Sequence, residues 1–160
     1  MARVSAGLLM FRRRDSRIQV LLVHPGGPFF RQKDSGAWSI PKGQVGPDEE
    51  VLVRARIEFQ EELGCEAEGK FMELGSVRQK GGKIVHGWAF ESDLPEGFIL
   101  RSNLFELEWP PNSGQVANFP EVDRAEFFDL EEAKNKINPA QKVFLERLRS
   151  LLTERQPRSV

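Results

Sequence analysis

Cysteine and histidine are scarce in this sequence of 160 residues, which contains one cysteine and two histidines. The single cysteine, Cys65, excludes a disulfide bond within the chain and argues against a zinc site built on cysteine ligands. Disulfide-poor chains are typical of reducing compartments. The cysteine content therefore favours a cytoplasmic protein.

The sequence has neither a large excess of positive or negative residues nor a long apolar run. The formal net charge is −1, which argues against a large basic surface for nucleic acid and leaves room for a local basic pocket around a phosphate-bearing small molecule. The apolar run that ends in Arg12, Arg13 and Arg14 is too short for a signal-peptide core with its cleavage site, or for a membrane span. No membrane partner is expected.

No internal repeat, low-complexity tract or linker divides the chain, and its length suits one compact domain. We expect a single domain over residues 1–152 and a frayed, flexible tail over residues 153–160. Apolar and β-branched runs between turn residues predict strands; these cover residues 4–11, 18–23, 71–79, 84–91 and 125–128. Glycine and proline predict a loop over residues 24–35 and an irregular stretch over residues 94–118.

Two helices are predicted from helical spacing of apolar residues. The first follows Pro47, carries acidic residues in its first turn and ends at Gly64, a favourable C-terminal cap. Its core-facing stripe consists of Leu52, Ala55, Phe59 and Leu63. The second begins near Asn138 and Pro139 and extends toward Leu152. Strands and helices together predict an α/β or α+β fold, a mixed β-sheet sandwiched between helices.

Several carboxylates share one side of the first helix. At about 100° per residue, Glu58 and Glu61 lie about 60° apart and Glu58 and Glu62 about 40° apart, roughly opposite the apolar stripe. Carboxylates so close repel one another unless a cation lies among them, and their hard oxygens suit Mg²⁺ or Mn²⁺. By composition alone a solvated glutamate-rich face is the commoner outcome, so the spacing has to decide.

The spacing resembles the Nudix box, G-x5-E-x7-R-E-U-x-E-E-x-G-U, where U is a bulky apolar residue. Residues 43–65 read GQVGPDEEVLVRARIEFQEELGC, and Cys65 occupies the last apolar position. The positions that match in register are Gly43, Glu49, Glu58, Phe59, Glu61, Glu62 and Gly64. The preceding WSIPK and stretches along nearly the whole chain are similar to a bacterial Nudix subgroup of predicted NTP pyrophosphohydrolases. The resemblance implies the Nudix fold and magnesium-dependent hydrolysis of a pyrophosphate link in a nucleotide-like substrate.

One position departs from the family pattern, which has arginine where this chain has Ile57. That arginine normally lies among the acidic residues and orients them. Arg54 is one turn earlier on the same side and is the best-placed substitute, whereas Arg56 is about 100° away. We expect Arg54 to compensate; the alternative is that catalysis is weakened.

The resemblance also implies roles for individual residues. Glu58, Glu61 and Glu62 would be catalytic and would bind the metal with the backbone carbonyl of Gly43. Glu49 and Arg54 would support these ligands from outside. Family members often add a carboxylate shortly before the last strand; the candidate here is Glu121, with Glu106 and Glu108 as alternatives.

The remaining candidates concern the substrate. Lys42 and Arg78 are candidate phosphate contacts, although surface charge explains Arg78 equally well. Phe29 and Phe30 lie in a Gly/Pro loop, where stacking on a base explains them better than core packing does. Nucleoside triphosphates and dinucleoside polyphosphates are the candidate substrates. Two rival hypotheses are a nucleotide-binding regulatory domain, because of Ile57, and RNA decapping, against which the near-neutral charge argues. Homodimerisation is compatible with the family.

Overall fold

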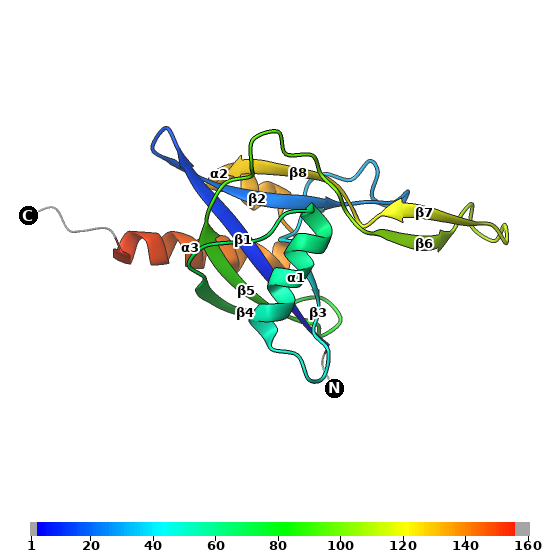
Figure 1. The fold of residues 1–160 in the computed structure, drawn as a ribbon, viewed down its shortest axis with the longest axis horizontal. Helices are drawn as coiled ribbons and strands as arrows, with labels where there is room; N and C mark the ends of the chain where they lie inside the picture. The colour runs from blue at the N-terminus through cyan, green and yellow to red at the C-terminus, as the bar shows by residue number, and fades with distance from the viewer. Residues whose placement is uncertain (1–2, 156–160) are drawn as a thin grey trace, which may run out of the picture.

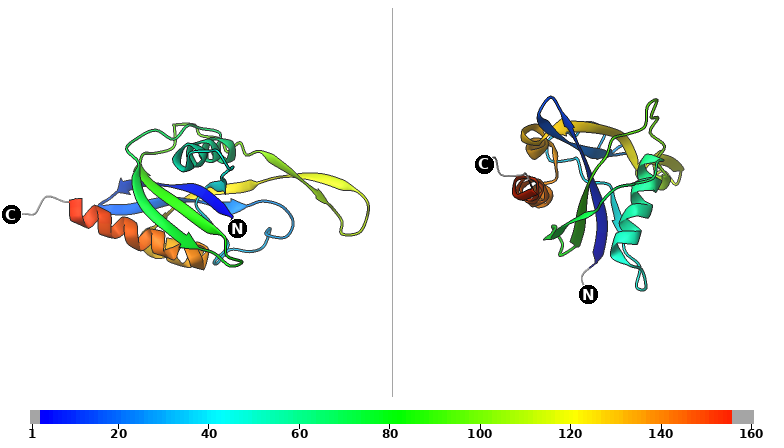
Figure 2. Two further views of the ribbon diagram at one scale, coloured as in Figure 1. Left: turned by 90° about the horizontal axis from the view of Figure 1, so that it is seen from below. Right: turned by 60° about the vertical axis from the view of Figure 1, so that its left-hand side comes forward.

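The computed structural model describes residues 3–155 and contains a mixed β-sheet between two layers of helices (Figures 1 and 2). Helix α1 (Val51–Leu63) covers one face, and helices α2 (Leu130–Lys136) and α3 (Lys142–Arg155) cover the other. The sheet has the order β4-β5-β1-β2-β8, with β3 paired to β1. Its strands are β1 Val4–Arg14, β2 Arg17–Pro25, β3 Lys42–Gln44, β4 Met72–Arg78, β5 Ile84–Glu91 and β8 Val122–Asp129. Only the β1–β5 pair is parallel among these pairings, so the sheet is mixed, as predicted from the sequence.

Alternate residues of β1 face opposite sides of the sheet and enter two separate cores. Leu9 and Phe11 pack with Phe144 and Leu148 of α3 (Lys142–Arg155). On the other face, even-numbered residues of β1 pack with α1 (Val51–Leu63); the buried partners there are Ala6, Leu8, Met10, Ala55, Phe59 and Leu63. The predicted apolar stripe therefore anchors α1 to the sheet, and the exposed side of the helix is formed by Val53, Arg56 and Gln60.

The ends of α1 differ in how well the sequence predicted them. Gly64 adopts the left-handed conformation at φ 84° and its N–H donates to the Gln60 carbonyl, which confirms the glycine cap. The acidic residues at positions 48–50, however, precede the helix, because Glu50 is extended and α1 begins at Val51. The expectation that they occupy the first turn was wrong, and Glu49 has another partner, described below.

The stretch over residues 94–118 was predicted to be irregular, and this was partly wrong. Strands β6 (Leu104–Glu108) and β7 (Val116–Pro120) form a separate two-stranded sheet, with Phe105 opposite Phe119. This hairpin, here called the arm, projects beyond the body of the protein (Figure 2). Pro110 and Pro111 lie in the turn between the strands, and Pro120 is the last residue of β7, so none of them lies in the middle of the ladder.

The C-terminal region contains one helix that the sequence did not reveal, α2 (Leu130–Lys136). Seven residues are too few to show clear helical periodicity. A single 3-10 turn, η1 (Pro139–Gln141), then leads into α3. Helix α3 continues to Arg155, so residues 153–155 are helical and not part of a frayed tail; residues 156–160 lie outside the described part of the chain. No helix within residues 3–155 is long and apolar enough to cross a membrane.

We predict that Asn138→Ala lowers the free energy of unfolding by about 1 kcal/mol, the typical loss for a helix cap. The Asn138 side-chain oxygen accepts a hydrogen bond from the Ala140 N–H at 3.0 Å, as the predicted N-cap requires. Urea denaturation of the variant measures the loss, and Asn138→Ser, which keeps an acceptor, is the control. Equal stability of Asn138→Ala and wild type would contradict the assignment.

Candidate active site

Strand β3 and helix α1 meet at Gly43, where the side chain of Glu58 lies directly against the backbone. A Cβ atom built on Gly43 would lie 1.9 Å from the Glu58 carboxyl carbon. Any larger residue at position 43 would therefore displace this carboxylate. The first glycine of the box is required by close approach, since its φ is outside the left-handed region.

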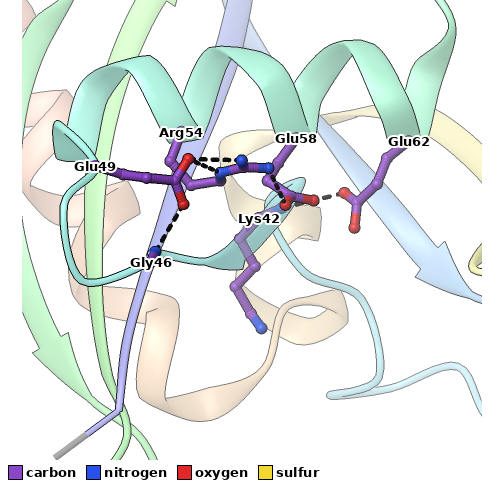
Figure 3. Close-up of polar contacts among 6 residues, drawn as sticks. All are labelled: Lys42, Gly46, Glu49, Arg54, Glu58 and Glu62. Carbon is purple, nitrogen blue, oxygen red and sulfur yellow. Dashed lines mark hydrogen bonds and ion pairs between the residues drawn. The ribbon is translucent and has the colours of Figure 1, made fainter.

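Arg54 lies between two box glutamates and binds both of them (Figure 3). Its Nε and NH2 donate to Glu49 Oε2 at 2.8 and 2.6 Å, and its NH1 donates to Glu58 Oε1 at 3.1 Å. Glu49 uses its other oxygen to accept the Gly46 N–H at 2.7 Å. The hydrogen bonds from Arg54 and Gly46 lower the pKa of Glu49. Arg54 thus occupies the orienting position that the sequence suggested for it.

Ile57 has a different environment. It lines a shallow groove on the outer side of α1 together with Val53, Arg56 and Gln60. The guanidinium of Arg56 lies over the ring of Phe71, 5.2 Å from its centroid. The residue that departs from the family pattern therefore lines this groove and makes no contact with the Arg54 network among the hydrogen bonds of the described residues, and Arg56 packs on Phe71.

Glu62 is the most buried of the box carboxylates, with 8% of its surface exposed. Its Oε2 accepts the backbone N–H of Lys42 at 3.1 Å. Burial, reinforced by the charge of Glu58, raises the pKa of Glu62 to about 8. Burial also raises the pKa of Glu58, against the effect of Arg54 and with a contribution from Glu61. In both groups burial is the largest cause of the raised pKa, and the charge of a neighbouring glutamate adds to it.

Glu121 is brought to the same end of α1 by backbone hydrogen bonds. Asn103 N–H donates to the Glu61 carbonyl at 3.2 Å, and Glu121 N–H donates to the Asn103 carbonyl at 2.8 Å. Glu121 itself lies between β7 and β8, in the loop before the last strand. Burial and the charge of Glu61 raise its pKa. The sequence pointed to Glu121 and to this loop; the linking residue Asn103 left no signal there.

The alternatives to Glu121 lie on the arm. Glu106 and Glu108 are exposed residues of β6. Glu108 accepts the Asn112 N–H at 2.8 Å, within the turn of the arm. Within residues 3–155, no three Asp, Glu, His or Cys side chains are drawn together closely enough to hold a metal ion. Glu49 and Glu58 bind Arg54, and Glu62 binds the Lys42 N–H.

The structure does not bring the two candidate phosphate contacts together. The Lys42 side chain points away from α1, toward the other face of the sheet (Figure 3). Burial, followed by the neighbouring charge of Lys83, lowers the pKa of Lys42 to about 8. Arg78 is exposed on β4, the outermost strand, and β5 and β1 separate it from β3. Arg78 therefore does not lie among the residues of the Nudix box.

Phe29 and Phe30 remain exposed, at 58% and 39% of their surfaces. The ring of Phe29 meets that of Trp109 edge to face at 5.5 Å, so the Gly/Pro loop lies along the arm. The end of this loop is held by His24, which bonds to the Lys33 carbonyl at 2.6 Å. The loop and the arm form one aromatic flank on the side of the molecule where Glu121 lies.

The family model described as the NUDIX domain matches residues 1–148. The chain belongs to the Nudix family of hydrolases. Solved structures share the Nudix fold along almost the whole chain. The C. elegans Ap4A hydrolase in a binary complex has a TM-score of 0.68 at 22% identity, covering 96% of this chain and 99% of that chain. The predicted mixed sheet between helices is confirmed.

Two further Nudix structures illustrate the range of the fold. The NUDIX domain of Shewanella oneidensis NrtR, complexed with ADP ribose, has a TM-score of 0.64 at 15% identity, covering 95% of this chain and 89% of that chain. The M. smegmatis Nudix hydrolase RenU has a TM-score of 0.58 at 19% identity, covering 98% and 89%. At such identities the likeness concerns the fold, and the roles of individual residues have to be argued from this chain.

Proposed function

We propose that this Nudix protein hydrolyses a pyrophosphate link in a nucleoside diphosphate-linked substrate, with a divalent metal ion held by the box. The observation that carries the proposal is the gathering of four glutamates around one end of α1. Glu58 lies against Gly43, Glu62 is buried beside it, and the charge of Glu61 acts on both Glu58 and Glu121. So much negative charge at one place is typical of a cation site.

The donor set fits Mg²⁺, with Mn²⁺ as the alternative, because every side-chain donor is a hard carboxylate oxygen. Glu58, Glu61, Glu62 and Glu121 would hold the ion, together with the carbonyl of Gly43. When bound, the ion supplies positive charge beside an anionic phosphorus and lowers the pKa of coordinated water. Glu58 would polarise the attacking water, and Arg54 holds Glu58 in place through its NH1.

The substrate class rests on resemblance and on the aromatic flank. The structural neighbours include an Ap4A hydrolase and a domain complexed with ADP ribose. Ap4A joins two adenosines through a chain of phosphates, and ADP ribose joins adenosine to ribose through a diphosphate. Both contain a nucleoside diphosphate unit, which supports nucleoside triphosphates or dinucleoside polyphosphates as substrates here. Phe29 and Phe30 offer exposed rings on which a base would stack. The single cysteine supports a cytoplasmic setting.

A panel assay tests this function. Purified protein is incubated with nucleoside triphosphates, dinucleoside polyphosphates and nucleotide sugars, with Mg²⁺ or with EDTA, and the products are separated by chromatography. We expect one substrate class to be cleaved with Mg²⁺ and left intact with EDTA. Cleavage that persists in EDTA would refute the metal-dependent mechanism.

A second candidate, nucleotide binding without turnover, is favoured by Ile57 at the family's arginine position. Protein that is folded and binds nucleotides, yet cleaves no member of the panel, would support it. The Ile57→Arg variant then separates the two cases. Activity gained by this variant identifies a damaged enzyme, whereas an inactive variant that still binds identifies a binding domain.

We predict that Arg54→Met lowers kcat by about 10–100-fold, the usual cost of losing a partner of a metal ligand. Glu49 and Glu58 would lose their shared donor, while the surface that binds substrate stays intact, so KM should change little. Arg54→Lys, which keeps the charge without the planar fork, should recover part of the rate. If Arg54→Met retains the wild-type kcat, Arg54 does not replace the family arginine.

A further inference from the structure

The Nudix box begins where the chain passes from one strand of the sheet to another. Ser39 and Val23 of β2 exchange two backbone hydrogen bonds, at 2.8 and 3.0 Å. Three residues later, Lys42 pairs with Gly7 of β1, and Gly43 follows directly. The two residues between Ser39 and Lys42 lie outside both ladders, so their backbone groups need other partners. Residues 39–42, here called the crossing, therefore determine where the box starts.

Strand β1 and the side chain of Gln141 supply these partners. Pro41 has no N–H, and its carbonyl accepts the Leu8 N–H at 3.1 Å. The Ile40 carbonyl accepts the Ser39 hydroxyl at 2.7 Å, and the Ile40 N–H donates to the Gln141 side-chain oxygen at 3.0 Å. Ile40 and Gln141 are both fully buried, at 0% exposure. Without the Gln141 oxygen, the Ile40 N–H would be buried and unpaired, a state that proteins rarely tolerate.

The other end of the Gln141 amide fixes its direction. Because the Ile40 N–H can only donate, the amide oxygen faces Ile40 and the amide nitrogen faces away from it. That nitrogen donates to the Ser39 hydroxyl and to the Gln79 side-chain oxygen, both at 3.0 Å. Gln79 belongs to the turn between β4 and β5, where its N–H donates to the Lys83 carbonyl at 2.7 Å. The Gln141 amide therefore joins the crossing to this turn.

The crossing is held from both faces of the sheet. Gln141 is the last residue of η1, which leads into α3 on the face opposite α1 (Figure 2). From α1, the Glu62 carboxylate accepts the Lys42 N–H at 3.1 Å. The next residue is Gly43, and the Glu58 carboxylate lies so close to it that even a methyl group would not fit between them. A shift of the crossing therefore moves Gly43 relative to both carboxylates.

We propose that Gln141 is a positioning residue for the metal site of the box, which it does not touch. Its amide fixes the path of the crossing and, through it, the distance from the Gly43 carbonyl to the carboxylates of α1. This role rests on the proposed function and deepens it. A residue that only stabilises the fold can be replaced without changing the site of the folded protein, whereas replacing a positioning residue lowers metal affinity and rate.

Isothermal titration of metal-free protein with Mn²⁺ tests this role without any turnover. Gln141→Met keeps the length of the side chain and removes its hydrogen bonds to the crossing and to the turn. We expect Mn²⁺ binding about tenfold weaker and kcat lower by a similar factor, as for lost support of a metal ligand, with little change in KM. Leu152→Ala is the matched control, because it opens a cavity near the far end of α3. It should lower the melting temperature and leave Mn²⁺ affinity and kcat unchanged.

Gln141→Met that is folded by circular dichroism and binds Mn²⁺ as tightly as wild type would overturn the role. If this variant does not fold, Gln79→Met replaces it, since it frees the Gln141 amide from the turn and keeps the bond to Ile40. Gln79→Met should also weaken Mn²⁺ binding, and wild-type affinity in it would overturn the role in the same way.

The amide signals of Lys42 and Gly43 in ¹⁵N-labelled protein provide a measurement that needs neither metal nor substrate. They should shift in Gln141→Met, or in Gln79→Met where that variant replaces it, and keep their positions in Leu152→Ala. Wild type that binds no Mn²⁺ would refute the metal site of the proposed function. Unshifted Lys42 and Gly43 signals, in wild type that does bind Mn²⁺, would refute the positioning role alone.

Discussion

Glu61→Gln is expected to fold like wild type and to lower metal-dependent kcat/KM by at least about 100-fold. Changing even the outer partners of metal ligands costs about 10–100-fold, and Glu61 is proposed as a ligand itself. The side chain is half-buried, and its charge raises the pKa of both Glu58 and Glu121. Removing that charge relieves repulsion in the metal-free protein, so stability should be unchanged or higher.

Two measurements on Glu61→Gln separate a metal role from a structural one. Steady-state kinetics give kcat/KM, and titration with Mn²⁺ should show weaker metal binding than wild type. Glu68→Gln, the same chemical change at an exposed position beyond the helix, should match wild type in both. Full activity in Glu61→Gln would show that this residue is not a metal ligand. The clustered carboxylates would then no longer support a metal site.

Gly43→Ala is expected to lower kcat by about 100-fold while the protein stays folded. The added methyl would lie 1.9 Å from the carboxyl carbon of Glu58, so this carboxylate has to move by an ångström or more. Misplacement of about 1 Å in an active site costs on the order of 100-fold. The Arg54–Glu58 ion pair at 3.1 Å would be broken or lengthened by the same movement.

Gln44→Ala is the matched control for Gly43→Ala, since it removes an exposed side chain from the next position of β3. Its activity should equal that of wild type. The second readout is the crystal structure of Gly43→Ala, in which the Glu58 carboxylate should have left the β3 backbone. An active Gly43→Ala enzyme with Glu58 displaced would show that the position of Glu58 does not limit the reaction.

The sequence was most informative where spacing along one element determines geometry. The register of the box predicted that Glu58 and Glu62 share a side of α1 and that Gly64 caps it, and it singled out Arg54 as the substitute for the missing arginine. In the structure Arg54 binds both Glu49 and Glu58. All these relations are local. A helix of 13 residues with a buried stripe leaves little freedom for their relative directions.

Contacts between segments that are distant in the chain were harder to predict from the sequence. The proximity of Glu121 to Glu61 depends on Asn103, which bonds to both through its backbone, and a backbone contact leaves no trace in residue type. The direction of Lys42 depends on the pairing of β3 with β1, because a shift of one residue would turn its side chain to the other face. A strand of three residues is too short for its register to be predicted from alternation.

The arm and the six-stranded sheet are expected to differ in how well they tolerate insertions and deletions. Its two strands pair only with each other among the described elements, and its turn over residues 110–114 is exposed. Lengthening or shortening such a hairpin at its tip leaves the six-stranded sheet and both cores untouched. Over evolutionary time the arm can therefore diverge in length and sequence faster than the scaffold. In the laboratory, residues 110–114 are the natural place to insert a label or a second domain.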